Sequence, residues 1–167
     1  MKKLFSLLAV AFSLTSLAAS ATGLLIVQEQ QAAGTHGGTS VAGTQTRTLN
    51  TVLVNTIAGA SLSANQVSLP SGTYVASFSC PAYSVDRHQV WLHDITASAN
   101  YYGANSSSTY GGGSLSESAG NAVFTLAGAD VLELVHYTQR AYPTAGLGLN
   151  NASGAPSVFC RLSIQQL

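Results

Sequence analysis

The densest group of polar side chains in the sequence lies between residues 86 and 94. Asp86, Arg87 and His88 are consecutive, and His93 and Asp94 follow them. A histidine beside a carboxylate can act as a general base with its orienting group, and both residue types are metal ligands. However, His88 and His93 are five apart and face opposite sides of a strand, so a shared metal would require a bend. We therefore predict that Asp86, Arg87 and His88 form a structural polar cluster at a turn, and we assign no catalytic residue, metal or cofactor.

Three tyrosines mark the best candidate for a ligand-binding segment. Tyr101, Tyr102 and Tyr110 lie in a polar stretch, Tyr101 to Gly120, that is rich in Gly and Ser. Exposed tyrosines among Ser, Gly and Asn provide rigid aromatic surface and adaptable hydrogen bonds, which is the composition of evolved binding loops. We predict that these tyrosines bind a ligand such as a sugar, which stacks on aromatic rings. The alternative is an ordinary mobile loop.

The segments that must position these groups follow a β pattern. Short apolar or alternating runs are separated by Gly, Pro, Asn and Ser, and no segment after residue 21 keeps a helical period for three turns. The pattern predicts an all-β sandwich, with Pro81 ending one strand and a hairpin at Ala127–Asp130. The predicted strand runs are Thr51–Val54, Thr73–Cys80, Gln89–Ile95, Val123–Leu126, Val131–Thr138 and Val158–Ile164.

One further histidine lies inside a predicted strand. His136 is in phase with Leu132 and Leu134, so we predict that it points into the core. Glu133 and Tyr137 lie on the opposite phase and face solvent or a subunit axis.

The serines are not part of a G-x-S-x-G nucleophile elbow. We therefore predict that the protein is not an enzyme, and an exported hydrolase ranks third among the candidate functions.

The composition limits the partners. The 167 residues suffice for one domain, and only 7% are charged, against about 25% in ordinary soluble proteins. Lysine occurs only at Lys2 and Lys3, so we exclude nucleic acid, which requires several clustered cations. The expected outward positions are mostly neutral, with residues such as Val135 and Tyr137 among them. Such faces favour contact between subunits, and we predict a closed symmetric homo-oligomer.

The N-terminus has the layout of a secretory signal peptide. A short basic head precedes an uncharged, mostly apolar run from Leu4 to Leu17, and the small residues Ala19 and Ala21 follow. We predict cleavage after Ala21, which gives a mature protein that begins at Thr22 and is not stably inserted in a membrane. If the apolar stretch is extended to residue 27, a retained anchor is the alternative. The predicted organisation is a signal peptide at 1–21, an extended lead-in at 22–46 and the β domain at 47–167.

Export also bears on the two cysteines. Cys80 and Cys160 would then reach a compartment where a disulfide persists. Two buried free thiols, which behave as small apolar side chains, are the alternative.

A more specific pattern begins at Arg47. The run RTLNTVLVNTIAGASLSANQVSLPSGTY, followed by PAYSVDRHQVWLHDIT, resembles a jelly-roll domain of tailed-phage and prophage virion proteins. That domain is similar to the globular head of complement component q and to the tumour necrosis factor superfamily. The segments GTHGGTSVAGTQTRTLN, FTLAGADVLELVHYTQ and GLGLNNASGAPSVFCRLSI fit the same pattern, so the resemblance covers residues 25–167.

The resemblance implies a fold, an assembly and a cysteine pairing. The implied fold is an antiparallel two-sheet jelly roll of about ten strands, usually a trimer presented on a virion or fibre, often for attachment. In that topology the strand ending at Cys80 and the final strand are antiparallel neighbours. Pairing Thr73 with Leu167 places Cys80 opposite Cys160, where a cross-strand disulfide is possible.

Two functions lead on these grounds. The first is a homotrimeric, non-enzymatic structural or attachment module that is displayed on a virion or secreted to the periplasm or cell surface. The second is a secreted lectin-like module that binds carbohydrate. The expected partners are copies of the chain itself and a cell-surface glycan or receptor.

Overall fold

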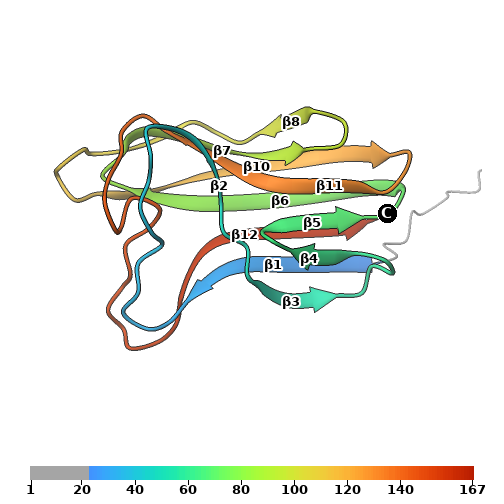
Figure 1. Cartoon of the computed structure of the whole chain (residues 1–167), viewed down its shortest axis with the longest axis horizontal. Helices are drawn as coiled ribbons and strands as arrows, with labels where there is room; N and C mark the ends of the chain where they lie inside the picture. The colour runs from blue at the N-terminus through green and yellow to red at the C-terminus, as the bar shows by residue number, and fades with distance from the viewer. Residues whose placement is uncertain (1–22) are drawn as a thin grey trace, which may run out of the picture.

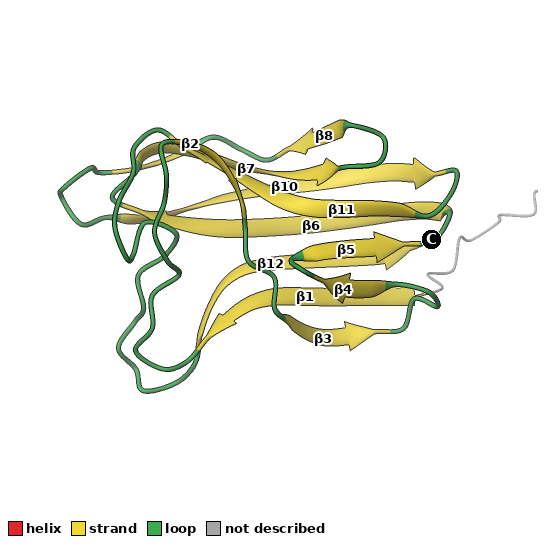
Figure 2. Cartoon of the chain, viewed as in Figure 1, coloured by secondary structure: helices red, strands yellow, loops and turns green. Residues whose placement is uncertain are grey.

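The computed structural model describes residues 23–167, so the predicted signal peptide at residues 1–21 lies outside the described residues. Across residues 23–167 the chain forms twelve strands in two antiparallel sheets and contains no helix (Figure 2). Within the same range, therefore, no helix is available that could cross a membrane. These observations confirm the predicted all-β, two-sheet jelly-roll sandwich, with twelve strands rather than about ten.

The first sheet contains five strands and the second contains seven (Figure 1). The strands of the first are β1 (Gly23–Gln31), β3 (Thr51–Asn55), β6 (Gly72–Tyr83), β10 (Leu115–Leu126) and β12 (Ser157–Gln166). Those of the second are β2 (Gly43–Thr46), β4 (Ser61–Ser63), β5 (Gln66–Leu69), β7 (Asp86–Asp94), β8 (Ala99–Tyr102), β9 (Ser106–Ser108) and β11 (Asp130–Thr138). The five-stranded order is β10-β6-β12-β1-β3. The seven-stranded order is β4-β5-β11-β7-β8, with β2 also paired to β11 and β9 to β7.

The core lies between the two sheets and follows the period-2 alternation of the strands. Inward side chains of β6, such as Tyr74, Ala76 and Phe78, are buried against Leu132 and Leu134 of β11 and their neighbours in one continuous cluster. Because successive side chains of a strand point to opposite faces, alternating sequences supply one buried and one outward face. The hydrophobic burial of this seam is the main driving force for the fold.

The pairing of β6 with β12 brings the two cysteines together. Tyr74 pairs with Gln166, and the Leu167 N–H donates to the Thr73 carbonyl at 2.9 Å. In this register Cys80 and Cys160 are joined by a disulfide, with their Cα atoms 4.3 Å apart. Both are fully buried, so the bond links two strands inside the core, in the register that the resemblance implied.

Two turn predictions differ from the structure. The expected hairpin at Ala127–Asp130 does not form, because β10 and β11 lie in different sheets and the connection crosses between them. Pro81 does not end its strand and pairs with Glu117 inside β6. The Pro81 carbonyl accepts from Arg47, whereas the paired residues of β12 end at Arg161. The proline nitrogen, which has no N–H to donate, faces the same side as this carbonyl, where β12 no longer pairs with β6. The proline therefore costs no hydrogen bond between strands.

Two segments of the predicted extended lead-in are strands of the sandwich. Residues 23–31 form β1, which lies between β12 and β3 in the five-stranded sheet, and residues 43–46 form β2. The apolar residues Leu25 and Val27 are fully buried, so this segment alternates as a core strand does. The side chains of β12 do not alternate regularly between the core and the outer face. A bulge opposite Gln28 and Gln30 turns Val158 outward, while Phe159 and Cys160 are both buried.

The two ends of the sandwich differ. The start of β1 and the end of β12 lie at one end, near the C-terminus (Figure 1). The connections that follow β1, join β9 to β10 and precede β12 lie at the other end, which we call the loop end, as the colours of Figure 1 show. Both ends of the described chain, Gly23 and Leu167, therefore lie opposite the loop end.

Candidate functional site

A chain of hydrogen bonds runs through the core between the sheets. Glu29 of β1 accepts from Arg47 Nη2 at 2.7 Å, and Arg47 Nη1 lies 3.1 Å from His136 Nδ1. His136 Nε2 is 3.0 Å from His88 Nδ1, and His88 Nε2 is 2.8 Å from Ser116 Oγ. The first four residues are almost completely buried. We call this set the buried polar chain.

The chemistry of Arg47 fixes the direction of these bonds. A guanidinium can only donate, so His136 Nδ1 must be the acceptor and the proton of a neutral His136 lies on Nε2. That proton is donated to His88 Nδ1, so the proton of His88 lies on Nε2 and is donated to Ser116 Oγ. His88 therefore cannot take the proton of Ser116, as a catalytic base would. The distance resembles that between a nucleophilic serine and its base, but here the histidine donates the hydrogen bond and the serine oxygen accepts it.

Arg47 also stabilises backbone groups where the strands diverge. Its guanidinium donates to the carbonyls of Pro81 at 3.2 Å and Leu147 at 2.8 Å. Burial lowers the pKa of Arg47 and raises that of Glu29, and each charge opposes the shift of the other. The pair thus ties β1, β6 and the loop before β12 to one buried guanidinium.

Both buried histidines are held neutral. Burial, with a smaller contribution from the charge of Arg47, lowers the pKa of His88 to about 4. The same causes, with a further contribution from His88, lower the pKa of His136 to about 2. These directions agree with the tautomers assigned above, because a second proton on either ring would place two donors face to face.

We expect the free energy of unfolding to fall as the pH drops from 6.5 to 4. The unfolded chain binds a proton at each histidine in this range, whereas the folded rings stay neutral, so acid favours unfolding. Each ring contributes about 1.4 kcal/mol per pH unit, and the raised pKa of Glu29 opposes part of this just above pH 4.5. Urea titrations at pH 7.5, 6.5 and 5 measure the effect. In His88→Gln one of the two rings is gone, so the free energy of unfolding should change with pH about half as steeply. Equal urea midpoints at all three pH values would contradict the conclusion that His88 and His136 are both neutral in the folded protein.

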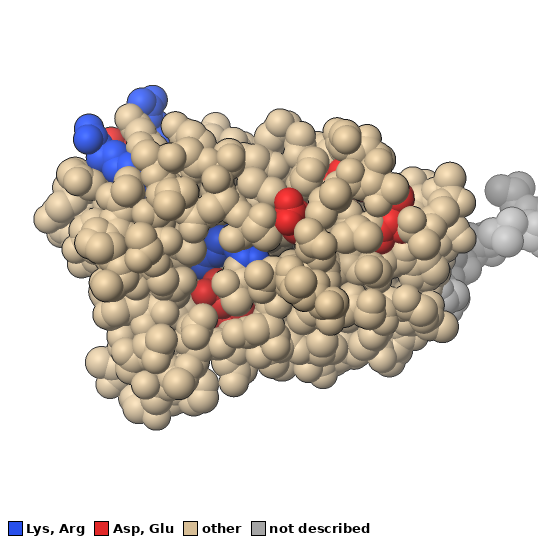
Figure 3. Space-filling view, viewed as in Figure 1, with Lys and Arg blue, Asp and Glu red and all other residues tan. Residues whose placement is uncertain are grey.

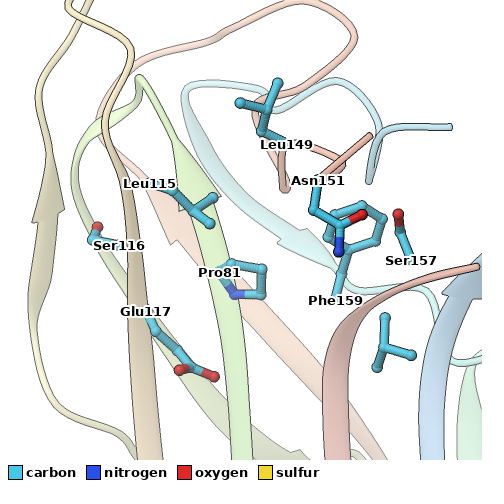
Figure 4. A pocket seen from close by; sticks show the side chains of 9 residues that line it. Pro81, Leu115, Ser116, Glu117, Leu149, Asn151, Ser157 and Phe159 are labelled. Atoms are coloured by element: carbon cyan, nitrogen blue, oxygen red, sulfur yellow. The ribbon is translucent and has the colours of Figure 1, made fainter. Parts of the chain in front are cut away.

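A pocket of about 400 Å³ lies where β12 diverges from β6. Figure 4 shows Pro81, Leu115 and Glu117 on one side and Asn151, Ser157 and Phe159 on the other. Ser116, the last member of the buried polar chain, also lines it. Its outer walls include exposed apolar side chains from β10, β12 and the loop between β11 and β12, namely Leu115, Val158 and Leu149.

The predicted cluster at residues 86–88 is divided between the surface and the core. Asp86 has a left-handed φ of 67° and forms a surface ion pair with Arg140 at 3.5 Å. Arg87 donates to the side-chain oxygen of Gln139 at 2.7 Å. His88 points inward to the buried polar chain. His93 lies on the opposite, outward face and bonds Asn100.

The three predicted ligand-binding tyrosines do not form one site. Tyr101 is half-buried and stacks on Phe124 in the core, with ring centroids 5.1 Å apart. Tyr102 is 62% exposed on the outer face of the seven-stranded sheet. Tyr110 is at the loop end, with the guanidinium of Arg140 4.8 Å from its ring. The segment from Tyr101 to Gly120 is also largely strand, because β9 and half of β10 lie within it.

A second pocket, of about 290 Å³, lies on the outer face of the seven-stranded sheet. Trp91 of β7 forms its aromatic wall and lies 5.6 Å from the ring of Tyr102. The remaining lining is polar apart from Val135: Thr44, Gln45, Thr46, His93, Asn100 and Glu133. We call this the outer-face pocket. Of the predicted ligand-binding residues, Tyr102 alone adjoins it.

The outer surface of the five-stranded sheet, which we call the neutral face, carries little charge. Its exposed charged residues are Arg161 and, one row nearer the loop end, Glu117, which pairs with Pro81. Three successive rows of outward residues cross its strands, and they contain one charged residue, Arg161, which donates to Gln28 at 3.0 Å. A hollow of about 250 Å³ lies within the rows and is lined mainly by small side chains. Val123 at one edge is 69% exposed. The rows are Val123-Val75-Gln165-Leu24, Asn121-Ser77-Ser163-Ile26-Val54 and Ala119-Ser79-Arg161-Gln28-Thr51.

Charged side chains are sparse elsewhere as well. On the face shown in Figure 3 most of the surface is uncharged. One group of basic side chains lies at the loop end, and a second lies nearer the middle beside acidic atoms. Arg87 and Arg140 belong to the loop end, beside Asp86.

Several residues that organise these sites were not among the predicted site residues. Glu29 and Arg47 fell in or beside the predicted lead-in, and their partners are 18 to 100 residues away. Nothing local in the sequence marks such a pair. Trp91 carried a usable signal, because it lies out of phase with Val90 and Leu92 and must therefore face outward.

Comparison with known proteins agrees with this fold. The sequence matches no family model and no curated protein. Murine APRIL at pH 5.0 matches with a TM-score of 0.58 at 10% identity, over 87% of this chain and 98% of that one. The globular domain of zebrafish complement 1qA matches with a TM-score of 0.57 at 13% identity, over 87% of this chain and 97% of that one. APRIL is a tumour necrosis factor family protein, so the predicted resemblance to both groups is confirmed for the fold.

Proposed function

We propose that the chain is a non-enzymatic attachment module that works as a homotrimer assembled through its neutral face. The observation that carries the proposal is the near absence of charge from three rows of side chains across five strands. A broad neutral surface with exposed apolar residues is typical of subunit contacts. The match of the fold to APRIL and to the complement 1qA domain supports a trimer, which the sequence resemblance also implies.

The small side chains of the neutral face support close contact between copies. Ser77, Ser79 and Ala119 surround the hollow, so side chains of another copy can enter it without displacing a bulky group. The apolar rim of the 400 Å³ pocket, with Leu115 and Val158, continues the face toward the loop end. Contact with another copy would cover these residues.

The positions of the chain ends and the loops are suited to a protein that is displayed on a surface. Both ends of the described chain lie opposite the loop end (Figure 1), so a trimer held at its termini on a cell surface or virion would present its loops outward. We further propose export, with cleavage after Ala21 and a mature chain that begins at Thr22. The reversed polarity of the His88–Ser116 bond supports a binding role rather than hydrolysis.

A carbohydrate-binding module is the second candidate. The observation that favours it is the pairing of an outward tryptophan with an exposed tyrosine, Trp91 with Tyr102, beside polar groups on the seven-stranded sheet. Aromatic rings with nearby hydrogen-bonding groups provide the contacts that sugars need.

Charge introduced at the neutral face should dissociate the trimer. Ser77→Glu and Val123→Glu each place a carboxylate where neutral side chains of two copies would meet, and burying an unpaired charge is costly. Light scattering should change from three copies to one in both variants. Ser68→Glu, on the other sheet, is the matched control and should stay trimeric. If both neutral-face variants kept three copies, the interface would lie elsewhere and the proposal would fail.

A further inference from the structure

We propose that the outer-face pocket binds one pyranose ring of a saccharide. The inference deepens the carbohydrate-binding function proposed above and rests on it. It replaces the predicted set of three tyrosines with a site that one of them, Tyr102, adjoins through Trp91, and it adds residues of β7, β8 and β11.

The register of the strands builds the pocket from two adjacent rows. The first row is Thr46-Val135-Trp91-Tyr102, and the second is Gln66-Glu133-His93-Asn100. Residues two apart on a strand are separated by about 7 Å, which is enough for a sugar ring to lie between the rows. One side of the space is therefore aromatic and the other is polar.

The polar row offers hydrogen bonds of both kinds. Glu133 Oε2 accepts from Thr46 at 3.0 Å and Gln66 at 3.5 Å, so the carboxylate is held by two neighbours. Its other oxygen, Oε1, takes part in neither bond and can accept from a hydroxyl. The Asn100 side-chain oxygen is bound to His93, which leaves its NH₂ group as a donor.

The tautomer of His93 follows from its partners. His93 Nδ1 lies 3.2 Å from the Ala99 carbonyl and 2.8 Å from Asn100 Oδ1. Both are acceptors if the amide is placed in this way, so Nδ1 carries the proton and Nε2 is an acceptor. The row thus combines two acceptors with one amide donor. Sugar hydroxyls donate and accept at the same time, and they match such a mixed set.

Other ligand classes fit this chemistry less well. Glu133 would repel an anion, and neither an arginine nor a lysine lines the pocket to attract one. A quaternary ammonium would contact Trp91 and Tyr102 favourably and would be attracted by the Glu133 carboxylate. However, it forms no hydrogen bond and would leave the amide, hydroxyl and imidazole groups without partners. A neutral ligand rich in hydroxyls satisfies both walls.

The pocket stays open in the proposed assembly. It lies on the seven-stranded sheet, whereas the neutral face belongs to the five-stranded sheet on the opposite side of the sandwich. A saccharide bound there does not compete with contact between copies. Three equivalent pockets on one trimer would also strengthen binding to a surface that carries many identical sugars.

The chain carries its own reporter for this site. Trp91 is the single tryptophan of the sequence, so its fluorescence reports directly on the pocket. The exported protein would be titrated with the methyl pyranosides of glucose, galactose, mannose and N-acetylglucosamine, with glycerol and choline chloride as comparisons. We expect a saturable change in emission with at least one pyranoside and none with glycerol.

Variants locate the binding. Glu133→Gln and Asn100→Ala should each weaken binding of the responding pyranoside by about tenfold, the effect of losing one good hydrogen bond. Asp86→Asn, the same change from carboxylate to amide, lies outside both the pocket and the neutral face and should bind as the unmodified protein does. Thermal melts of all three variants verify folding, and Asn100 is exposed, so its replacement removes no core contact.

Three results would overturn the inference. They are no response to any of the four pyranosides, a saturable response to choline alone, and pyranoside binding that is unchanged in both Glu133→Gln and Asn100→Ala. Light scattering on the same samples reports the assembly separately. A trimer without saccharide binding would reject this site alone, and a monomer that binds saccharide would reject the assembly alone.

Discussion

Replacing Arg47 with alanine should lower the free energy of unfolding by about 3–5 kcal/mol. The guanidinium is fully buried and its partner Glu29 is equally buried, so the variant leaves a carboxylate in the core without its counter-charge. It also removes the donor to His136 and the donors to the carbonyls of Pro81 and Leu147. Urea denaturation at pH 7.5 measures the loss.

Two comparisons separate the buried pair from a general effect of losing an arginine. Arg87→Ala, at an exposed position of β7 on the other sheet, should change stability by less than about 1 kcal/mol. A double variant, Glu29→Leu with Arg47→Met, removes both charges and should be more stable than Arg47→Ala alone. If Arg47→Ala unfolded within 1 kcal/mol of the unmodified protein, the buried polar chain would not hold the sheets together as described.

Removing the disulfide should cost about 4 kcal/mol. Cys80 and Cys160 are 80 residues apart in the sequence, and closing a loop of that length restricts the unfolded chain by about this amount. The test compares urea unfolding of the oxidised protein with that of a Cys80→Ala, Cys160→Ala double variant. A mass measurement without reductant should show two hydrogens fewer than the sequence requires.

Two results would contradict the predicted role of the disulfide. If two thiols could be alkylated in the native exported protein, the cysteines would be free despite their adjacent positions. If the bond were present but its loss changed the stability by less than about 1 kcal/mol, the constraint on the unfolded chain would be much weaker than the loop length implies.

The sheets were predictable because their strands alternate. Runs such as Thr73–Cys80 place every second side chain in the core, and that periodicity is visible without the structure. The crossing at residues 127–129 was not, since a short turn between two apolar strands is equally compatible with a hairpin and with a change of sheet. Pairing in a β sandwich depends on distant strands, which local patterns do not specify.

The binding residues were predicted only in part. Tyr101 and Tyr102 are adjacent on β8 and must face opposite sides, so they cannot share one site. Applying the period-2 rule to both would have separated them. The grouping of Trp91 with Glu133 and Asn100 depends on the register of three strands. No spacing in the sequence shows it, because β8 and β11 are more than 25 residues apart.

The most direct measurement for the whole account is the mass of the unmodified exported protein in solution at micromolar concentration. Sedimentation equilibrium should give three times the mass of one mature chain, because the neutral face is then covered by neighbouring copies. A mass equal to a single chain would contradict this, since the rows on the five-stranded sheet would face water with no partner.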